Sequence, residues 1–520
     1  MISHKDDNIY AVTVLAAAAL GALLVQRYWS SPWRKLPPGP RGFPLIGNLL
    51  DLRARQWETF KQWKTTYGNV IFLRAAGQPI LVLNSQKAAA DLLDRRAALY
   101  SDRPRNVVCS MIACRGLFLP LERYGERWQR MRRATHESLA QIDNERHFKN
   151  TQKQMAAQLA LALLEKPEEW REQVHRTLAS VLLAAAYDAP PVDTADAPVM
   201  KTIDVFMSHL KIATIPGAYL AEFFPLMRHI PSRFAQWKRE AETWFSQDTA
   251  NFEGLFDYAT QKMGQGTEHR SLAAILMDNA EKFDVSRTES AWLAGTIYAA
   301  GFDTTSTMVS WWFLAMVAHP EYQARAQAEI DAVVGRARVP ALEDLPHLPY
   351  VRAIIREVLR WRPVGPLGVP HQSVEDDWYD GMFIPAGTTC VPNVWAINHD
   401  PAVYGADAGD FNPARHLDAN GDLAPAFADT KNQGHSTFGF GKRVCLGRHM
   451  ANAAMAIDAA TILWACKIER GMDKHGKETP LDVHGYVDEG VAAIQPVPFA
   501  CKVTARFAEA GRLLAAGSCA

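Results

Sequence analysis

One short stretch limits what this chain can fold into and bind more than any other. Residues 438–448 read Phe-Gly-Phe-Gly-Lys-Arg-Val-Cys-Leu-Gly-Arg, so a single cysteine, Cys445, stands in a glycine-rich loop before a predicted helix over residues 447–465. The N–H groups and partial positive charge at a helix start lower a thiol pKa and favour the metal-binding thiolate. Gly439 and Gly447 allow unusual φ angles and close approach of the backbone to a flat ligand. Taken alone, the stretch also fits a buried structural cysteine.

The size and composition of the chain fit a large globular body. With 520 residues, 48% of them hydrophobic, the chain can bury a sizeable core, which excludes a disordered protein. Lys plus Arg and Asp plus Glu number 56 each and no basic block occurs, so a nucleic-acid partner is not expected. The seven cysteines are scattered and form neither CxxC nor CxxCH, which predicts reduced thiols, no zinc ribbon and no covalent haem attachment.

An apolar run near the amino terminus predicts a membrane anchor. Residues 9–25 would span roughly 25 Å as a helix, just below a hydrocarbon core of about 30 Å. The alternative is a secretory signal peptide, but Lys5, Asp6 and Asp7 make a poor positively charged start and no clear small-residue cleavage site follows. We therefore expect a retained transmembrane helix within residues 1–28.

The segment after this run predicts the orientation of the chain. Arg27, Arg34 and Lys35 follow the apolar residues closely, and by the positive-inside rule they leave the rest of the protein in the cytosol. A Pro-Pro-Gly-Pro sequence then favours a stiff, extended backbone, so residues 29–40 are interpreted as a hinge before the main body of residues 41–520. The expected localisation is a single-pass membrane protein.

The body predicts a mainly α fold with small β-sheets, an α+β class. Two apolar runs separated by a glycine-containing stretch predict a hairpin over residues 70–73 and 80–83. Proline-free segments rich in helix formers predict helices over residues 150–165, 168–186, 235–263, 289–318 and 321–335. Short strands are expected within residues 367–395 and 485–504. Since repeats and an internal linker are both lacking in the sequence, one domain is the simplest division.

The cysteine loop resembles a known family motif. The haem loop of the cytochrome P-450 superfamily has the form Phe-x-x-Gly-x-Arg-x-Cys-x-Gly, which this chain matches in full at Phe438, Gly441, Arg443, Cys445 and Gly447. The resemblance extends across essentially the whole chain. It implies the cytochrome P-450 fold and a haem b cofactor (iron protoporphyrin IX) with the Cys445 thiolate as axial ligand. The resemblance further implies that the cofactor is contacted by Phe438, Gly439 and Gly447.

A second motif of the same family lies upstream of the loop. Glu357 and Arg360 form an ExxR pair whose i,i+3 spacing puts both side chains on one helical face. Alone it would be an ordinary surface ion pair worth about 0.3 kcal/mol. In the family this pair joins a downstream arginine, here Arg415, to brace the haem pocket. The acid and aromatic residue that usually flank this arginine are Ala414 and His416 here, which leaves the local packing open.

A third motif lies inside the long helical stretch over residues 289–318. Gly301, Asp303 and Thr304 resemble the family's distal motif above the iron. Because glycine in a helix costs about 1 kcal/mol relative to alanine, its presence beside an acid and a hydroxyl needs an explanation. A threonine hydroxyl can bond to a carbonyl of the preceding turn and help to open a water-lined groove. The alternative is a polar patch on a buried helix.

Four residues resemble the family's anchors for the haem propionates. They are Trp128 and Arg132, spaced as WxxxR, together with His371 and Arg443. Two carboxylates in a dry site need charge-assisted donors. Each residue also has an ordinary interpretation: Trp128 as core, Arg132 as part of an exposed basic face and His371 as a loop residue.

The resemblance implies a monooxygenase that cleaves O₂ and inserts one oxygen atom into an organic substrate. Cys445 would donate electron density to the iron, while Asp303 and Thr304 would order the water that supplies protons. No dinucleotide fingerprint opens a helix in this sequence, so electrons are expected from NADPH:cytochrome reductase at the endoplasmic reticulum. Two alternatives stay open: a haem-thiolate isomerase or peroxygenase that needs no outside electrons, and a haem sensor without turnover.

The substrate is predicted only as a class. The loops are similar to those of fungal members that act in secondary metabolism. By family position, the pocket would draw on mainly aliphatic stretches: residues 107–119, 207–215, 298–299, 364–369 and 491–494. Such a lining favours an apolar, medium-sized molecule such as a terpenoid or polyketide intermediate.

Overall fold

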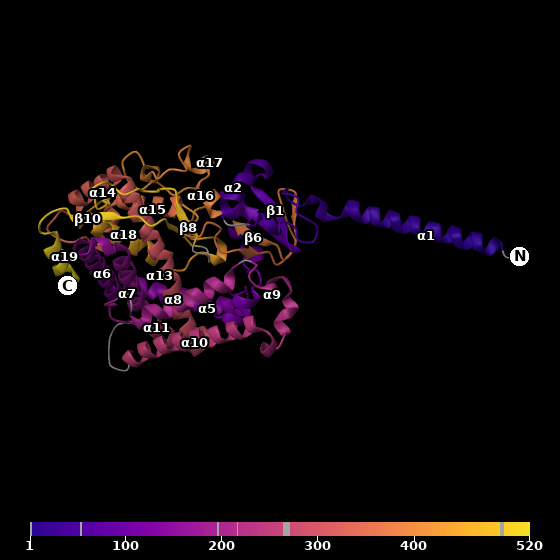
Figure 1. The fold of residues 1–520 in the computed structure, drawn as a ribbon, viewed down its shortest axis with the longest axis horizontal. Coiled ribbons are helices and arrows are strands. Elements are labelled where there is room, and N and C mark those ends of the chain that lie inside the picture. Colours follow the sequence, from indigo (N-terminus) through magenta and orange to yellow (C-terminus); the bar gives the residue numbers. More distant parts are fainter. Residues whose placement is uncertain are drawn as a thin grey trace.

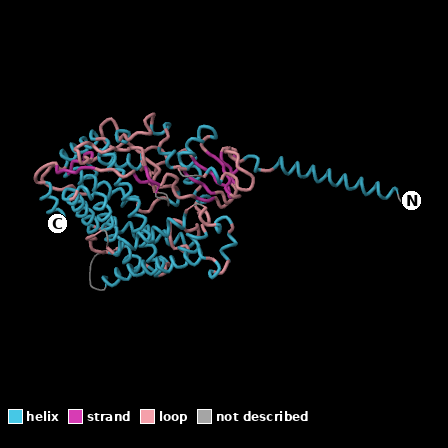
Figure 2. The backbone as a smooth tube through the Cα atoms, in the orientation of Figure 1, coloured by secondary structure: helices cyan, strands magenta, loops and turns pink. Residues whose placement is uncertain are grey.

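Helices form most of the body, and the strands gather in its upper half as drawn (Figures 1 and 2). The computed structural model describes residues 3–52, 55–194, 197–215, 217–263, 271–488 and 493–519. The mainly α class with small sheets is therefore confirmed. The long helices predicted from the sequence are present, with ends that differ by a few residues.

The longer helices are α1 Ser3–Ser30, α2 Gln56–Tyr67, α5 Glu126–Asn144, α6 Arg146–Glu165, α7 Trp170–Tyr187, α8 Pro198–Thr214, α10 Gln236–Met263, α11 Leu272–Asp278, α13 Arg287–Ala318, α14 Pro320–Val333, α15 Pro349–Trp361, α18 Arg448–Ala465 and α19 Ala510–Cys519. The short ones are α3 Gln86–Ala89, α4 Ala97–Tyr100, α9 Leu220–Phe223, α12 Ala280–Phe283, α16 Val394–Asn398 and α17 Pro401–Tyr404. Single tighter or wider turns include η4 Val107–Ala113, η9 Pro413–His416 and η10 Gly441–Arg443.

The strands form one larger sheet and several pairs. Among the described residues, the larger sheet has the order β1-β2-β6-β3, in which β2 and β6 run parallel and the other neighbours antiparallel. The predicted hairpin is confirmed, with Val70 opposite Leu83. The bounds are β1 Val70–Ala75, β2 Gln78–Leu83, β3 His371–Gln372, β4 Asp377–Tyr379, β5 Met382–Ile384, β6 Thr389–Pro392, β7 Cys466–Arg470, β8 Tyr486–Asp488, β9 Ile494–Pro496 and β10 Cys501–Ala505. The pairs are β4-β5, β8-β9 and β7-β10.

Helix α13 runs through the core of the body. Its start is set by a capping box, in which the Ser286 hydroxyl accepts from the Glu289 N–H and the Glu289 carboxylate accepts from the Ser286 N–H. Most of its side chains are buried, because other helices cover it on several sides. Helix α7 packs along it, with Trp170 stacked on Phe313 at 4.6 Å. A β-carbon on Gly301 would lie 2.9 Å from Leu182, so this glycine permits the close packing of α7.

The amino-terminal helix α1 extends away from the body (Figure 1), and its described side chains, such as Val14 and Leu15, are exposed. Along the part of the chain that the structure describes, no helix combines the length and the apolar character needed to cross a membrane. The expected transmembrane helix is therefore not supported. The proline-rich segment lies against the body, since the Phe72 N–H donates to the Pro38 carbonyl at 2.9 Å.

Candidate functional site

The cysteine loop folds back on itself before α18. The Cys445 N–H donates to the Phe438 carbonyl at 2.8 Å, which closes the loop. Gly439 has φ +78°, and a β-carbon there would meet nothing within 4 Å. Gly441 has φ +56°, and a β-carbon there would lie 2.1 Å from the Leu93 carbonyl oxygen. Gly447 differs from expectation: as the residue before α18 it has φ −80°, so it needs no unusual backbone angle, although the space beside it is open.

The Cys445 thiol lies at the start of α18. Of the six cysteines whose side chains are described, it alone is exposed. Its removal from bulk water by the surrounding protein raises its pKa, while the N–H groups of Gly447 and Arg448 and the charges of Arg448 and Arg132 act in the opposite direction. The helix start therefore favours the thiolate as predicted. In the protein alone, the loss of hydration caused by the surrounding protein atoms has the larger effect on the Cys445 pKa, although part of the side chain is accessible. A cation bound to sulfur would reverse this balance.

Three arginines gather next to this loop together with a tryptophan and a histidine. We call the set the cationic cluster after its arginines: Arg103, Arg132, Arg443, Trp128 and His371. Arg132 Nη2 donates to the Val444 carbonyl at 2.7 Å, beside the cysteine. The Arg443 guanidinium carbon lies 4.1 Å from the Trp128 ring centroid, and that of Arg132 lies 5.4 Å from it. The structure thus brings three of the four predicted anchors into direct contact.

The fourth predicted anchor and an unpredicted one complete the cluster. His371 is buried, and its Nδ1 lies 2.7 Å from the Tyr100 carbonyl. Arg103, which no sequence motif indicated, is 5% exposed and donates to the carbonyls of Pro120, Val369 and Pro370. Its neighbour Asp102 forms an isolated β-bridge with Gln372, next to His371, and this contact exists only after folding.

The charges of the cationic cluster are poorly compensated. Burial lowers the pKa of Arg443 to about 9 and that of Arg132 to about 10, with Asp102 and Cys445 respectively acting against the shift. Burial, followed by the charges of Arg443 and Arg132, lowers the pKa of Arg103. Arg443 Nε and Nη2 donate to carbonyls, whereas its buried Nη1 has no partner among the described residues.

Such a cluster fits the two carboxylates of a haem. A buried guanidinium with an unused donor, flanked by two more, is stabilised by anions that accept charge-assisted hydrogen bonds. The exposed thiol beside the cluster supplies a soft ligand, and the open space at Gly439 and Gly447 accepts a flat ring. The donor set, the orphaned Arg443 nitrogen and the glycine loop therefore match the prosthetic group implied by the sequence.

A second charged group lies deeper in the protein and is fully paired, and we call it the Glu357 network. Arg360 Nε and Nη2 each donate to one carboxylate oxygen of Glu357 at 2.7 Å, and both side chains are fully buried. Arg415 Nε donates to the same carboxylate at 3.0 Å. His416, which stands where the family has an aromatic residue, lies with its Nε2 2.9 Å from Glu357 Oε2. The predicted grouping of Glu357, Arg360 and Arg415 is present.

The Glu357 network compensates its buried charges, since Asp407 supplies Arg415 with a second carboxylate at 3.0 Å. Burial would raise the pKa of Glu357, but the hydrogen bonds from Arg360 and His416 outweigh it and lower the pKa to about 2. The remaining Arg360 Nη1 hydrogens go to the carbonyls of Asn398 and Ala408. The network links α15 to the segments that lead into the cysteine loop.

The distal motif lies on α13 without interrupting the helix. Thr304 Oγ1 donates to the Ala300 carbonyl at 2.7 Å, as expected for a hydroxyl that bonds to the preceding turn. Thr304 is exposed although most of the helix around it is buried, whereas Thr305 is only 9% exposed. Asp303 is half-buried. Its charge, with that of Asp204, partly offsets the lowering of the His175 pKa by burial. The Thr304 side chain is therefore accessible, whereas most of its neighbours on α13 are not.

Two of the stretches predicted to line a substrate pocket, residues 364–369 and 491–494, contact each other. The Ile494 N–H donates to the Val364 carbonyl at 3.0 Å, and the Ile494 carbonyl accepts from the Trp311 indole at 2.9 Å. Phe118 packs edge-on against Phe206 of α8 at 5.5 Å. Two of the predicted lining positions, 491 and 492, lie outside the described residues.

Known proteins are similar in sequence to this chain over nearly its full length. A family model described as cytochrome P-450 matches residues 37–484. A cytochrome P-450 monooxygenase of Armillaria gallica is 51% identical over 506 residues, which cover 97% of this chain and 96% of the relative. Cytochrome P-450 monooxygenase 58 of Postia placenta is 44% identical over 96% and 95% of the two chains. Cytochrome P-450 monooxygenase iboC of Amanita muscaria is 38% identical over 98% of each.

Family and fold agree with the site. Proteins of this family bind haem through a cysteine thiolate and act as oxidoreductases on O₂ and an organic substrate, with electrons from a redox partner. The matched length and identities far exceed what a shared fold alone would give. This chain therefore belongs to the cytochrome P-450 family and is a haem-thiolate monooxygenase.

Proposed function

We propose that the protein oxidises an apolar, medium-sized organic molecule at a haem whose thiolate ligand is Cys445. The observation that carries this assignment is the cationic cluster beside an exposed thiol, since both halves of a haem site occur together. The five other cysteines with described side chains are buried, which favours structural roles for them. An intermediate of secondary metabolism, such as a terpenoid or polyketide, fits the aliphatic stretches that line the predicted pocket.

Each residue of the site has a role in this proposal. Cys445 holds the iron, and the N–H groups of Gly447 and Arg448 stabilise its thiolate. Phe438, Gly439 and Gly447 shape the loop that would contact the ring. Glu357, Arg360 and Arg415 stabilise the segments that lead into that loop. The propionates are held by Trp128, Arg132, His371, Arg443 and Arg103. When bound, haem supplies one-electron chemistry and O₂ activation, which amino-acid side chains cannot supply.

Thr304 and Asp303 would manage the protons. Because the Thr304 hydroxyl hydrogen points to the Ala300 carbonyl, the lone pairs of Oγ1 can accept a hydrogen bond from a water in the proposed substrate space. Asp303, on the same turn of α13 and half-buried, can exchange protons with solvent and reload that water. The helix thus positions an acceptor and a proton donor side by side.

Electrons are proposed to come from NADPH:cytochrome reductase. The sequence has no dinucleotide fingerprint of its own. Exposed cations, including Lys442 in the cysteine loop and Arg133 on α5, offer a positive surface near the site for an acidic flavoprotein. A reductase docked there would be close to the thiolate side of the site.

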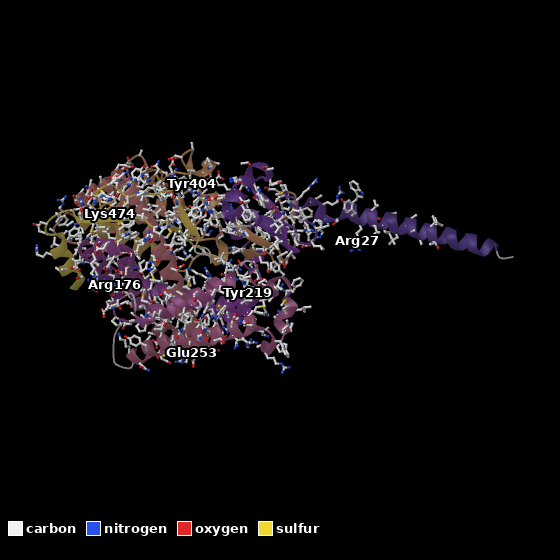
Figure 3. The ribbon with its side chains drawn as sticks, in the orientation of Figure 1. Arg27, Arg176, Tyr219, Glu253, Tyr404 and Lys474 are labelled. Atoms are coloured by element: carbon white, nitrogen blue, oxygen red, sulfur yellow. The ribbon has the colours of Figure 1, made fainter. Side chains whose placement is uncertain are left out.

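Membrane association is proposed as well, at the endoplasmic reticulum with the body in the cytosol. Helix α1 carries exposed apolar side chains, and Arg27 near its end lies outside the body (Figure 3). Leu45 and Leu226, in the segments before β1 and after α9, are 96% and 83% exposed. Apolar side chains presented together with basic residues favour a membrane surface. Sedimentation with membranes that survives high salt, and its loss on removal of residues 1–28, would support the association.

Reconstituted turnover tests the proposed chemistry. With reductase, NADPH, O₂ and a panel of apolar substrates, we expect oxidised product. Thr304→Ala should keep haem and substrate binding but lower product per NADPH by about 10-fold and release peroxide instead, because proton delivery by a positioned group is worth roughly 10²- to 10⁴-fold and water can partly replace one hydroxyl. Thr305→Ala, whose side chain is buried, is the matched control. Unchanged coupling in Thr304→Ala would remove this residue from the proton route, and turnover without NADPH would favour a peroxygenase or isomerase.

A further inference from the structure

A loop rooted on the cationic cluster forms an arch over residues 103–120. Arg103 Nε donates to the Pro120 carbonyl at 2.9 Å, which closes the base of this arch. Just beyond the arch, the Glu122 carbonyl accepts from Arg443 Nη2 at 2.8 Å. Within the arch, the Ser110 hydroxyl donates to the Leu121 carbonyl at 3.1 Å. Both ends of the arch are thus fixed to the residues proposed to hold the haem.

The top of the arch is held from outside by one carboxylate. Glu222 accepts from the Val107 N–H through Oε2 and from the Val108 N–H through Oε1, both at 2.9 Å. The next amide of the turn, that of Cys109, is satisfied locally by the Asn106 side chain at 2.6 Å. Glu222 therefore takes up the two backbone donors that the arch cannot satisfy by itself.

The residue that makes these bonds belongs to a surface segment of different character. Glu222 lies in α9, whose neighbouring side chains Leu220 and Phe224 are each 62% exposed. Helix α9 lies at the end of the body from which α1 projects (Figure 1), and Tyr219, just before it, is labelled in Figure 3. The partly buried Glu222 carboxylate thus joins an apolar outer surface to the arch.

The inner side of the arch borders the space proposed for the substrate. Phe118 packs on Phe206, and Phe206 packs on Trp292 of α13, so the arch lies between the cationic cluster and the distal helix. Farther along, the Arg115 guanidinium lies 4.1 Å from the Phe245 ring centroid on α10. The turn bound by Glu222 is itself buried, since Val107 and Val108 are 0% exposed, and the Glu222 carboxylate satisfies the first two amides of this turn.

We propose that Glu222 is a positioning residue that latches the arch over the substrate space, so that loss of its two hydrogen bonds opens a route for apolar ligands. The inference rests on the proposed placement of haem and substrate inside the arch. Its physical basis is an anionic acceptor shared by two backbone donors, a contact stronger than a neutral hydrogen bond. Glutamine in its place would keep one acceptor and turn an NH₂ donor toward a backbone donor.

Amide hydrogen exchange on the holoprotein tests the latch without turnover. In Glu222→Gln, the peptide spanning residues 104–118 should exchange about 10-fold faster at its protected amides, while α18 peptides stay unchanged. Glu240→Gln, on the exposed part of α10 and without a bond to the arch, is the matched control. Unchanged protection at residues 107–108 in Glu222→Gln would overturn the latch. Glu222→Asp, too short to reach both donors, gives the same comparison if the glutamine variant folds poorly.

Ligand entry provides the second test. We expect clotrimazole, an apolar azole whose nitrogen binds ferric haem, to associate and dissociate about 10-fold faster in Glu222→Gln, with a smaller change in affinity. Imidazole, which is small, should bind at rates within about 2-fold of wild type. Equal clotrimazole rates in both proteins, or a loss of affinity at an unchanged association rate, would overturn the proposal. A wild-type protein that fails to bind haem would count against the haem site instead, and the same exchange comparison on the haem-free proteins would still decide the latch.

Discussion

The Glu357 network and the cationic cluster bury similar side chains but treat their charges in opposite ways. In the first, one carboxylate meets Arg360, Arg415 and His416, and the leftover donors reach carbonyls. In the second, Arg443 keeps a buried nitrogen without a partner among the described residues. Removal of one partner from a compensated buried pair destabilises the fold. An uncompensated buried cation, in contrast, is stabilised by an anion from outside the chain.

The difference separates residues that stabilise the fold from residues proposed to hold the cofactor. Removal of one partner from the Glu357 network leaves an unpaired buried charge in the core. Removal of a cation from the cationic cluster relieves mutual repulsion among Arg443, Arg132 and Arg103 in the haem-free protein. Stability and haem affinity should therefore respond in different places.

The largest effect is expected at the Glu357 network. Arg360→Ala should lower the free energy of unfolding by about 3–5 kcal/mol, because it leaves the Glu357 carboxylate buried beside fewer donors. Urea unfolding of the haem-free proteins measures the change. Lys166→Ala, which breaks an exposed i,i+3 pair with Glu169, should cost about 0.5 kcal/mol or less. Equal losses in both variants would erase the distinction between the two regions.

A smaller effect of another kind is expected at the cationic cluster. Arg443→Met should release haem to a haem acceptor about 10- to 100-fold faster, since charge-assisted hydrogen bonds contribute about 1.5–3 kcal/mol. In the same variant the free energy of unfolding of the haem-free protein should change by only about 1 kcal/mol, as lost carbonyl hydrogen bonds offset relieved burial of charge. A variant that keeps haem as tightly as wild type but unfolds readily would place Arg443 with the structural residues.

The smallest effect concerns pH. Burial lowers the pKa of His416 below its usual 6.5, despite the opposing hydrogen bond to Glu357. The unfolded chain then binds more protons, so this group makes stability fall as pH drops below about 6.5. His416→Phe should flatten the slope of unfolding free energy against pH just below about pH 6.5, by up to about 1.4 kcal/mol per pH unit. His475→Phe, at an exposed position, should leave the slope unaltered, and an unchanged slope in His416→Phe would assign the acid sensitivity to other groups.

Much of the site was predictable because its motifs are local. The haem loop fits within ten residues, and the i,i+3 spacing of Glu357 and Arg360 fixes their common face once a helix forms. The long helices followed from composition and the absence of proline. The bond of Thr304 to the preceding turn followed from the same helical geometry.

Other features depend on contacts between distant parts of the chain. Arg103 joins the cationic cluster, and Glu222 binds Val107 and Val108, only because folding brings separate segments together. The pairing of β7 with β10 likewise has no local signal. The prediction that Gly447 uses an unusual φ angle was wrong, because its φ of −80° is one that any residue can adopt. The contact of His416 with Glu357 could not be predicted from the family motif, because the family has an aromatic residue at this position.

The thiolate side of the haem site is tested most directly by the carbon monoxide spectrum of Cys445→Ser. The reduced wild-type protein should give the red-shifted Soret band that a thiolate ligand produces, and the variant should lose it. Cys466→Ser, at a buried cysteine that hydrogen-bonds a carbonyl of α6, should keep the band. Loss of the band in Cys445→Ser alone is the predicted result, and retention of the band in that variant would contradict the assignment of Cys445 as the ligand.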